Sequence, residues 1–290
     1  MKLRERFVET NGIRLHLVEA GPEDGQPVIL LHGFPDFWYG WRRQIPVLAA
    51  AGFRVFAPDQ RGYNLSDKPP HIRSYQLGQL TGDVAGLIKG LGYERASVVG
   101  HDWGGILGWA LAVQEPRRVD RLAVLNAPHP AVIFRFLRHD PEQIRRSWYV
   151  FLFQVPFMPE IGLRARGFAA LARTMRGAID AGSQAREDLR RYREAWSRPR
   201  ALSSMLHWYR AAGFAAVGRT VNPRVEIPTL MLWGMQDPAL SHRLARPSID
   251  YCTDGRLVLF PDASHWPHHD GAGDVNDLLI QFLKPAVLEG

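Results

Sequence analysis

The segment Gly100-His101-Asp102-Trp103-Gly104-Gly105 lies between an apolar run, Ala96-Ser97-Val98-Val99, and a stretch with helical spacing from Trp103 to Gln114. Glycines stand two residues before and two residues after Asp102. A sharp strand-to-helix turn requires small residues there, because larger side chains would clash where the backbone doubles back. An Asp that only caps a helix needs no such flanking glycines. We therefore expect an elbow that lifts Asp102 above a sheet.

Strand-like and helical patterns alternate on both sides of this segment. Continuous apolar runs such as Pro27-Val28-Ile29-Leu30-Leu31 fit strands that are buried on both faces. Their alternation with helical patterns is typical of a parallel sheet flanked by helices, so the expected fold class is α/β. We expect strands at 6–9, 14–19, 27–31, 53–57, 96–99, 121–125, 229–233 and 256–260, and helices at 36–51, 75–91, 103–114 and 274–283.

The pattern changes between residues 131 and 221, where helical segments occur with almost no strand signal. About 90 residues is within the usual range for a compact domain. We therefore expect a helical cap, or lid, at 131–221, inserted between a first part of an α/β core at 1–130 and a second part at 222–290.

Composition excludes several classes of protein. The 290 residues are 46% hydrophobic and 22% charged, as in ordinary globular proteins. The sequence contains no run of about 20 apolar residues, so no membrane span is predicted. The charged segment Met1–Thr10 does not resemble a secretory signal. The expected location is cytoplasmic. Cys252 is the single cysteine, so an internal disulfide and a cysteine-based metal cluster are excluded, and we expect a small buried apolar residue there.

The net charge of +7 raises the question of nucleic acid. The basic residues are nearly all arginines, and they are interleaved with acids, as in the segment 186–191. This pattern is typical of solvated helix faces, and no recognition motif accompanies it, so no nucleic-acid partner is expected. The sequence leaves the oligomeric state open.

A carboxylate at the apex of the elbow indicates a particular chemistry. Serine attack on a saturated carbon would leave an unreactive ether, whereas attack by Asp102 leaves an ester that water can cleave. The residue type therefore points to epoxides or alkyl halides as substrates. No metal and no organic cofactor is required for either reaction.

The second step needs a base that activates water. His265 follows the last expected strand, and Asp237 follows the strand before it. Asp237 would orient His265, and the chain order nucleophile, acid, histidine is that of α/β hydrolases. His268 and His269 are nearby competitors for the base. We prefer His265 because of its distance from the strand.

An oxyanion hole is expected from backbone N–H groups of Trp103 and Phe34. Phe34 lies in His32-Gly33-Phe34-Pro35-Asp36, directly after a buried run, and Pro35 has no N–H to offer. A cis Phe34–Pro35 bond is one way to hold this turn. The alternative is a simple turn that ends a strand.

These motifs, together with Asp59-Gln60-Arg61-Gly62-Tyr63, resemble those of soluble epoxide hydrolases, in the epoxide hydrolase and haloalkane dehalogenase branch of the α/β-hydrolase superfamily. The resemblance covers nearly the whole chain. It implies two cap tyrosines that hydrogen-bond the epoxide oxygen, Tyr149 within 147–154 and Tyr209 within 207–210. A hydroxyl with a pKa of about 10 can share its proton with the developing alkoxide. The alternative is that both tyrosines pack as amphipathic-helix residues.

The resemblance also concerns Asp36, which matches an acidic position of the first motif. We expect it to position the hydrolytic water or to cap a helix that begins there. The substrate pocket should be apolar and aromatic, which suggests a neutral hydrophobic epoxide and water as the partners. Its candidate walls are Phe34, Trp103, Phe153, Phe157 and Trp266.

Other functions remain as alternatives. A haloalkane dehalogenase shares the Asp nucleophile, and the Trp103 indole N–H could hold a halide. Such enzymes often carry Asn where this chain has Phe34, and some place the acid where it has Asn126. Fluoroacetate dehalogenases use arginines where this chain has Trp103 and Ile106. A non-catalytic binder need not retain a full triad, and a peptidase or lipase needs Ser or Cys at the apex.

Overall fold

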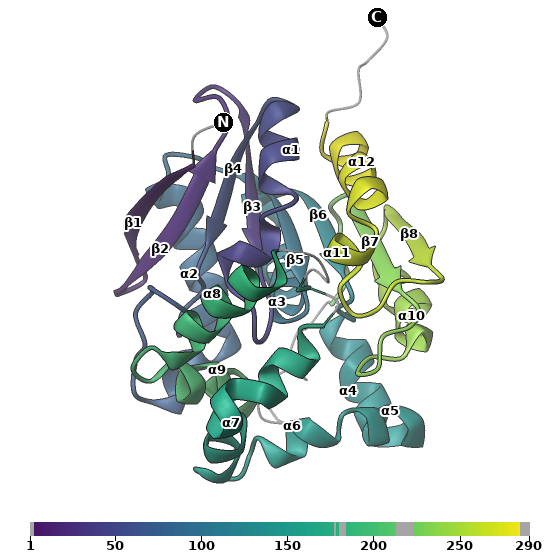
Figure 1. Ribbon diagram of the computed structural model, residues 1–290. Helices are drawn as coiled ribbons and strands as arrows, with labels where there is room; N and C mark the ends of the chain where they lie inside the picture. Colours follow the sequence, from purple (N-terminus) through teal and green to yellow (C-terminus); the bar gives the residue numbers. More distant parts are fainter. Residues whose placement is uncertain (1–2, 177, 180–183, 213–222, 285–290) are drawn as a thin grey trace, which may run out of the picture.

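The computed structural model describes residues 3–176, 178–179, 184–212 and 223–284 (Figure 1). Its centre is an eight-stranded sheet with the strand order β1-β2-β4-β3-β5-β6-β7-β8. The strands are β1 (Arg4–Thr10), β2 (Ile13–Ala20), β3 (Gln26–Leu31), β4 (Phe53–Pro58), β5 (Ala96–His101), β6 (Val119–Leu125), β7 (Thr229–Gly234) and β8 (Gly255–Phe260). Each expected strand is present, so the predicted α/β fold is confirmed.

The sheet is mostly parallel. Only the pairings of β1 with β2 and of β2 with β4 are antiparallel, and the remaining neighbours run parallel. The central strand β5 is buried along its whole length, as its continuous apolar run predicts. Helices cover both faces of the sheet: α1 packs with α12 on one, and α2 with α3 on the other (Figure 1). The carboxyl ends of the parallel strands therefore gather at one edge, where ligands of such sheets bind.

The helices of the core follow the predictions with one exception. A helix over 36–51 was expected, but the chain forms a short 3-10 helix at Trp38–Trp41 and then α1 (Ile45–Ala50). Pro46 explains the break, because it lacks the N–H that a continuous helix needs and is favoured in a first turn instead. The other core helices are α2 (Leu77–Gly90), α3 (Trp103–Gln114), α10 (Ala245–Ile249), α11 (Pro267–Asp270) and α12 (Ala272–Leu283).

In the described part of the segment between β6 and β7 the chain forms helices α4 to α9, most of them at the lower side of the view in Figure 1. The predicted boundaries of the cap stay a prediction, and its end at 221 falls outside the described residues. The cap helices are α4 (Pro130–His139), α5 (Pro141–Arg146), α6 (Trp148–Leu152), α7 (Met158–Thr174), α8 (Ala185–Ser197) and α9 (Ala201–Ala211).

Hydrogen bonds join the cap to loops that follow the core strands. The indole of Trp196 donates to the carbonyl of Pro35 at 2.6 Å, and the indole of Trp208 donates to the carbonyl of Arg61 at 2.9 Å. Both indoles are buried, so water does not compete for these bonds. They fix the cap over the strand ends.

The expectations about membrane spans and about Cys252 can be compared with the structure. Among the residues that the structure describes, no helix combines the length and the apolarity needed to cross a membrane. Cys252 is only partly buried, next to the edge strand β8, and it forms no disulfide.

Candidate active site

The turn between β5 and α3 has the geometry of an elbow. Asp102 adopts φ 51° and ψ −121°, a conformation that L-residues rarely take. A Cβ atom on Gly100 would collide with the carbonyl of Gly104, and one on Gly104 would collide with the carbonyl of Leu31. The two glycines are therefore needed for close approach of the backbone, and the strained turn exposes Asp102 at the strand end.

The Asp102 carboxylate faces the two amides expected to form an oxyanion hole. The Phe34 N–H donates to its Oδ1 at 2.8 Å. Burial raises the pKa of Asp102, while His265 and the N–H groups of Phe34 and Trp103 counteract this effect by stabilising the anion. The Phe34–Pro35 peptide bond is cis. Donors that hold a carboxylate here can also hold the negative oxygen of a tetrahedral intermediate.

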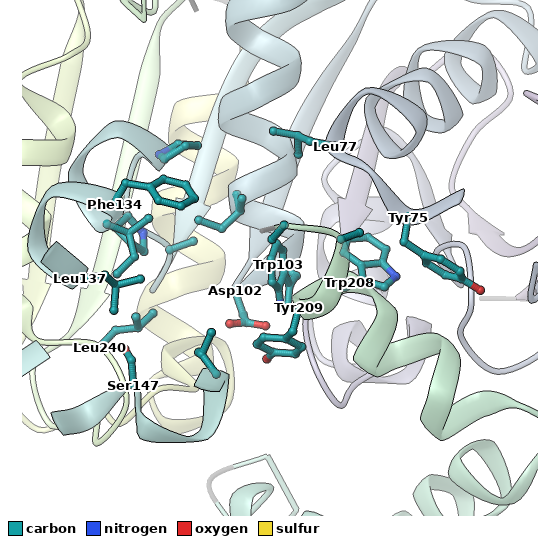
Figure 2. Close-up of a pocket in the computed structure, with 18 of the residues that line it drawn as sticks. Tyr75, Leu77, Asp102, Trp103, Phe134, Leu137, Ser147, Trp208, Tyr209 and Leu240 are labelled. Atoms are coloured by element: carbon teal, nitrogen blue, oxygen red, sulfur yellow. The ribbon is translucent and has the colours of Figure 1, made fainter. Parts of the chain in front are cut away.

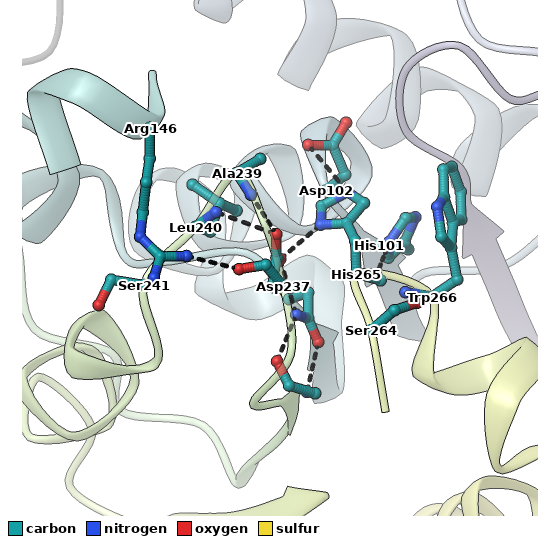
Figure 3. Close-up of polar contacts among 12 residues, drawn as sticks. His101, Asp102, Arg146, Asp237, Ala239, Leu240, Ser241, Ser264, His265 and Trp266 are labelled. Atoms are coloured by element: carbon teal, nitrogen blue, oxygen red, sulfur yellow. Dashed lines mark hydrogen bonds and ion pairs between the residues drawn. The ribbon is translucent and has the colours of Figure 1, made fainter. Parts of the chain in front are cut away.

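His265 links Asp102 to Asp237 (Figure 3). Its Nε2 lies 3.7 Å from Asp102 Oδ2, and its Nδ1 lies 2.6 Å from Asp237 Oδ2. Burial opposes a charged imidazole, yet the Asp237 carboxylate and, to a smaller extent, Asp102 raise the pKa of His265 to about 9. The three side chains come from the loops after β5, β7 and β8, so the parallel sheet brings together the three residues expected to act as nucleophile, base and acid.

Asp237 is buried and fully hydrogen-bonded. Its Oδ1 accepts from the amides of Ala239 and Leu240, at 2.8 and 3.0 Å, and its Oδ2 accepts from the Asn126 side chain at 2.8 Å. Burial alone would raise the pKa of Asp237, but His265 and these donors hold it below the usual value. Asp237 therefore stays ionised beside His265.

Asn126 has a positioning role that the sequence analysis missed. It ends the apolar strand β6, and it also bonds the backbone of Gly234, accepting from the N–H at 2.8 Å and donating to the carbonyl at 3.2 Å. A polar residue directly after a buried run, at the same sheet edge as Asp102, was the available signal. The structure makes it a donor to the acid, not the acid itself.

The competing histidines lie behind the site. His101 donates through Nε2 to the carbonyl of His265 at 2.8 Å, and its ring lies between those of His265 and His268. Burial lowers the pKa of His268 and of His269 well below the usual value, so both are neutral. Of the three candidates for the base, His265 is the one that forms an ion pair with Asp102.

One group among the described residues has the composition of a metal site. Side-chain ligand atoms of Asp36, His268 and His269 lie within 4.8 Å of one another, and all three residues are buried. Arg42 and Arg43 add positive charge, which contributes to the lowered pKa values of both histidines. The same charge disfavours a cation. We assign no metal to this group.

Asp36 itself is held at the junction of core and cap. It accepts hydrogen bonds from the Phe37 N–H at 2.7 Å and from the Tyr192 hydroxyl of α8 at 3.0 Å. Burial raises its pKa to about 7. It does not line the pocket that contains Asp102, and it does not cap an α-helix. The expected capping role is therefore wrong, and positioning of water stays a prediction.

Tyr149 of α6 and Tyr209 of α9 line one pocket together with Asp102 and Trp103, and Figure 2 shows Tyr209 beside the carboxylate. The centroids of the two tyrosine rings lie 6.1 Å apart. Burial, and then the charge of Asp102, raises the pKa of both hydroxyls above the usual value. Both tyrosines are therefore protonated and able to donate to an oxygen in the pocket.

The pocket is apolar on both sides of Asp102 (Figure 2). One side is built by α4 and the other by α2 and α9, and most of these residues escaped the sequence analysis because helical patterns do not tell which apolar face is inward. The additional lining residues include Leu77, Leu80, Ile106, Pro130, Ile133, Phe134, Leu137, Val150, Trp208 and Leu240.

Of the five walls expected from sequence, Trp103 lines this pocket and four do not. Phe157 is 78% exposed and faces solvent. Trp266 is buried beneath His265, where its indole donates to the carbonyl of Thr174 at 3.1 Å. Phe34 and Phe153 pack edge-on against the Tyr209 ring, with centroids at 5.3 and 5.0 Å. These two rings support a tyrosine of the pocket without forming its surface.

An eight-stranded mostly parallel sheet, an elbow after β5 and an acid–histidine pair at the neighbouring strand ends define an α/β hydrolase. The family model of the alpha/beta hydrolase fold matches residues 26–272, and the chain belongs to this family.

Relatives identify the branch. The chain is 44% identical over 280 residues to the AB hydrolase superfamily protein YfhM of Bacillus subtilis, covering 96% of this chain and 97% of that protein. It is 35% identical to epoxide hydrolase A of Mycobacterium tuberculosis, covering 96% and 97%. A crystal structure of a Bacillus megaterium epoxide hydrolase in complex with an inhibitor matches with a TM-score of 0.88 at 31% identity, covering 96% and 99%. The chain is thus an epoxide hydrolase-like α/β hydrolase, and it is a hydrolytic enzyme.

Proposed function

We propose that this enzyme opens hydrophobic epoxides to vicinal diols through an ester on Asp102. The observation that carries the proposal is the meeting of one carboxylate and two protonated tyrosines in a single apolar pocket. The carboxylate can attack saturated carbon, and the hydroxyls can stabilise the oxygen that leaves it. The proposed substrate is neutral and apolar because the pocket offers few polar groups away from these three residues.

In the first step, an Asp102 oxygen attacks an epoxide carbon and the carbon–oxygen bond of the ring breaks. The electron pair goes to the epoxide oxygen, which Tyr149 and Tyr209 stabilise by hydrogen bonds. That oxygen ends as a hydroxyl, with its proton delivered through the tyrosines. The product of the step is an ester between Asp102 and one carbon of the substrate.

The second step is prepared by the first. Ester formation removes the negative charge of Asp102, which is one of the effects that raise the pKa of His265. The pKa of His265 therefore falls, and the histidine gives up a proton more readily. This lost proton accounts for the one that the alkoxide has gained. Neutral His265, oriented by Asp237, takes a proton from water as the water attacks the ester carbonyl. The amides of Phe34 and Trp103 hold the resulting oxyanion. The oxyanion then collapses as the bond between the carbonyl carbon and the substrate oxygen breaks. That oxygen leaves as a hydroxyl of the diol with the proton of the newly formed carboxyl group, which restores the Asp102 carboxylate beside protonated His265.

A haloalkane dehalogenase is the second candidate, since Asp102, Asp237 and His265 would serve both reactions. Halide release needs N–H donors, such as the Trp103 indole in the pocket, and gains nothing from two tyrosine hydroxyls near the carboxylate. Relatives named as epoxide hydrolases at 35–37% identity also favour the first candidate. A non-catalytic binder would have no use for the hydrogen-bonded Asp237–His265 pair.

A paired turnover assay tests the proposal, with styrene oxide and 1-bromobutane as substrates of the purified enzyme. Diol formation without halide release is the expected result. Halide release without diol would establish the dehalogenase instead, and absence of both products with these and longer substrates would favour the binder.

A further inference from the structure

A short stretch of the cap exposes large apolar side chains. We call residues 148–161 the cap tip, because they run from the start of α6 into the first turn of α7 (Figure 1). Soluble surfaces rarely expose such side chains together, and clusters of them mark interaction sites. The exposed fractions are 62% for Trp148, 39% for Val155, 78% for Phe157, 62% for Met158 and 70% for Ile161.

The cap tip is anchored to the rest of the cap. Arg210 of α9 forms an ion pair with Glu160, with nitrogen–oxygen distances of 2.7 and 3.0 Å, and it donates to the carbonyl of Val155 at 2.9 Å. Gln154 donates to the carbonyl of Tyr209 at 3.2 Å. The apolar side chains thus project from a base with defined contacts.

Charge is distributed unevenly between the cap and the core. The segment 131–221 contains sixteen arginines and seven acidic residues, a balance of +9, and the rest of the chain therefore carries −2 of the total of +7. Three exposed arginines lie close to the cap tip in the sequence: Arg145 precedes α6, and Arg164 and Arg166 lie within α7. Within the described residues, none of these three forms an ion pair. The apolar cluster is therefore set in uncompensated positive charge.

The exposed apolar side chains and the positive charge together indicate which kind of partner the cap tip binds. A second copy of the chain would bring two strongly cationic caps together, which like-charge repulsion opposes. An anionic lipid surface satisfies both features, because arginines attract the head groups while Trp, Phe, Met and Ile side chains enter the interface. We propose that the cap tip docks on bilayers that contain anionic phospholipid.

The inner side of the same segment belongs to the substrate pocket, through Tyr149, Val150 and Gln154. Docking would therefore set the pocket next to the apolar phase in which hydrophobic molecules dissolve. Only this last consequence rests on the proposed epoxide hydrolysis. Docking itself is independent of it, so vesicle binding and turnover of a dissolved substrate are measured separately.

The test is co-sedimentation of the full chain with vesicles of phosphatidylcholine alone or mixed with phosphatidylglycerol. Binding is expected only with phosphatidylglycerol, and it should weaken as salt is added. The double variant Phe157→Asn/Ile161→Ser should lose most of this binding; Asn suits the positive φ of residue 157. Arg145→Gln and Arg164→Gln should each weaken binding about fivefold.

The matched control is Ile72→Ser/Leu259→Ser, which removes two exposed apolar side chains of the core, 44% and 42% accessible. Its binding should equal that of the wild type. Absence of binding to either vesicle, or equal loss in both double variants, would overturn the proposal. So would a dimer in sedimentation velocity that Phe157→Asn/Ile161→Ser dissociates, because the cap tip would then be a self-association surface. Turnover of styrene oxide in free solution should persist in every variant.

Discussion

Asp102 and His265 control each other's ionisation across 3.7 Å. Burial disfavours the charge on each side chain, and the opposite charge of its partner offsets part of this effect. A histidine with a pKa of about 9 is protonated at neutral pH and is a poor base. In the proposed mechanism, alkylation of Asp102 removes the smaller of the two charges that raise the pKa of His265, so this pKa falls once the ester exists. The proposed ester would therefore make His265 a better base for the second step.

Replacing the base should separate the two steps. In His265→Gln the ester should form and then persist, because no group activates water against it. Intact-protein mass spectrometry after mixing with styrene oxide should show an increase of one substrate mass. The double variant His265→Gln/Asp102→Ala is the control and should gain no mass. A single variant that turns over normally without an adduct would refute the role of His265.

The tyrosines should affect the first step. Tyr149→Phe and Tyr209→Phe each remove one donor to the leaving oxygen, and each should slow ester formation by about 100-fold, the lower end of the range for acid catalysis. The rate of epoxide consumption in a single turnover measures this step. Tyr93→Phe, a partly buried tyrosine outside the pocket, should leave the rate unchanged. An unchanged rate in Tyr149→Phe/Tyr209→Phe would remove both from the mechanism.

At the scale of elements, the elbow depends on backbone contact between β5, α3 and β3. Gly104→Ala would drive a Cβ into the Leu31 carbonyl, which cannot move aside in a central strand. We expect a loss of unfolding free energy of about 1–3 kcal/mol and a strong loss of activity. Gly78→Ala, on the exposed side of α2 with open space around it, should instead be neutral or stabilise by about 0.4–1 kcal/mol. Equal stability of the two variants, measured by urea denaturation, would contradict this account of the elbow.

The elements that the sequence predicts well are those whose burial is uniform. Strands β3 and β5 are buried on both faces and read as continuous apolar runs, so their positions and the Asp102 elbow follow from the sequence. The helix expected at 36–51 failed because Pro46 divides a region whose apolar spacing alone looks continuous. Local pattern therefore predicts an element best where a single environment shapes it.

The pocket shows where sequence reasoning ends. The cap pattern contains aromatic residues in abundance, but it does not tell which of them point inward. Phe157 was expected in the pocket and lies on the outside, whereas Phe134 lines it. Asn126 contacts Asp237 across 111 positions of sequence, a distance that only the assembled sheet closes. Residue types led to the proposed chemistry, and tertiary packing decided which side chains form the walls of the pocket.

At the scale of the whole molecule, the ionisation of His265 and Asp237 makes stability depend on pH. The pKa of His265 is 6.5 in the reference state and about 9 in the fold, so the fold favours its protonated form. This stabilisation is fully present below pH 6.5 and is lost as pH rises through about 9. The pKa of Asp237 is lowered, so its contribution is lost only in acid.

Thermal unfolding of the wild type and of His265→Gln measures this effect. As the pH is raised from 6 to 10, the unfolding free energy of the wild type should fall relative to that of the variant. Gln does not titrate, and the other groups are common to both proteins. A difference that is constant over this range would mean that His265 has no raised pKa in the fold.

The most direct test of the central claim, the ester on Asp102, is a single turnover of excess wild-type enzyme with styrene oxide in water labelled with oxygen-18. If water cleaves the ester at its carbonyl, the first diol carries no label and the peptide that contains Asp102 gains it. This is the result that the account predicts. A labelled first diol together with an unlabelled Asp102 would show that water attacks the epoxide directly, and it would contradict the account.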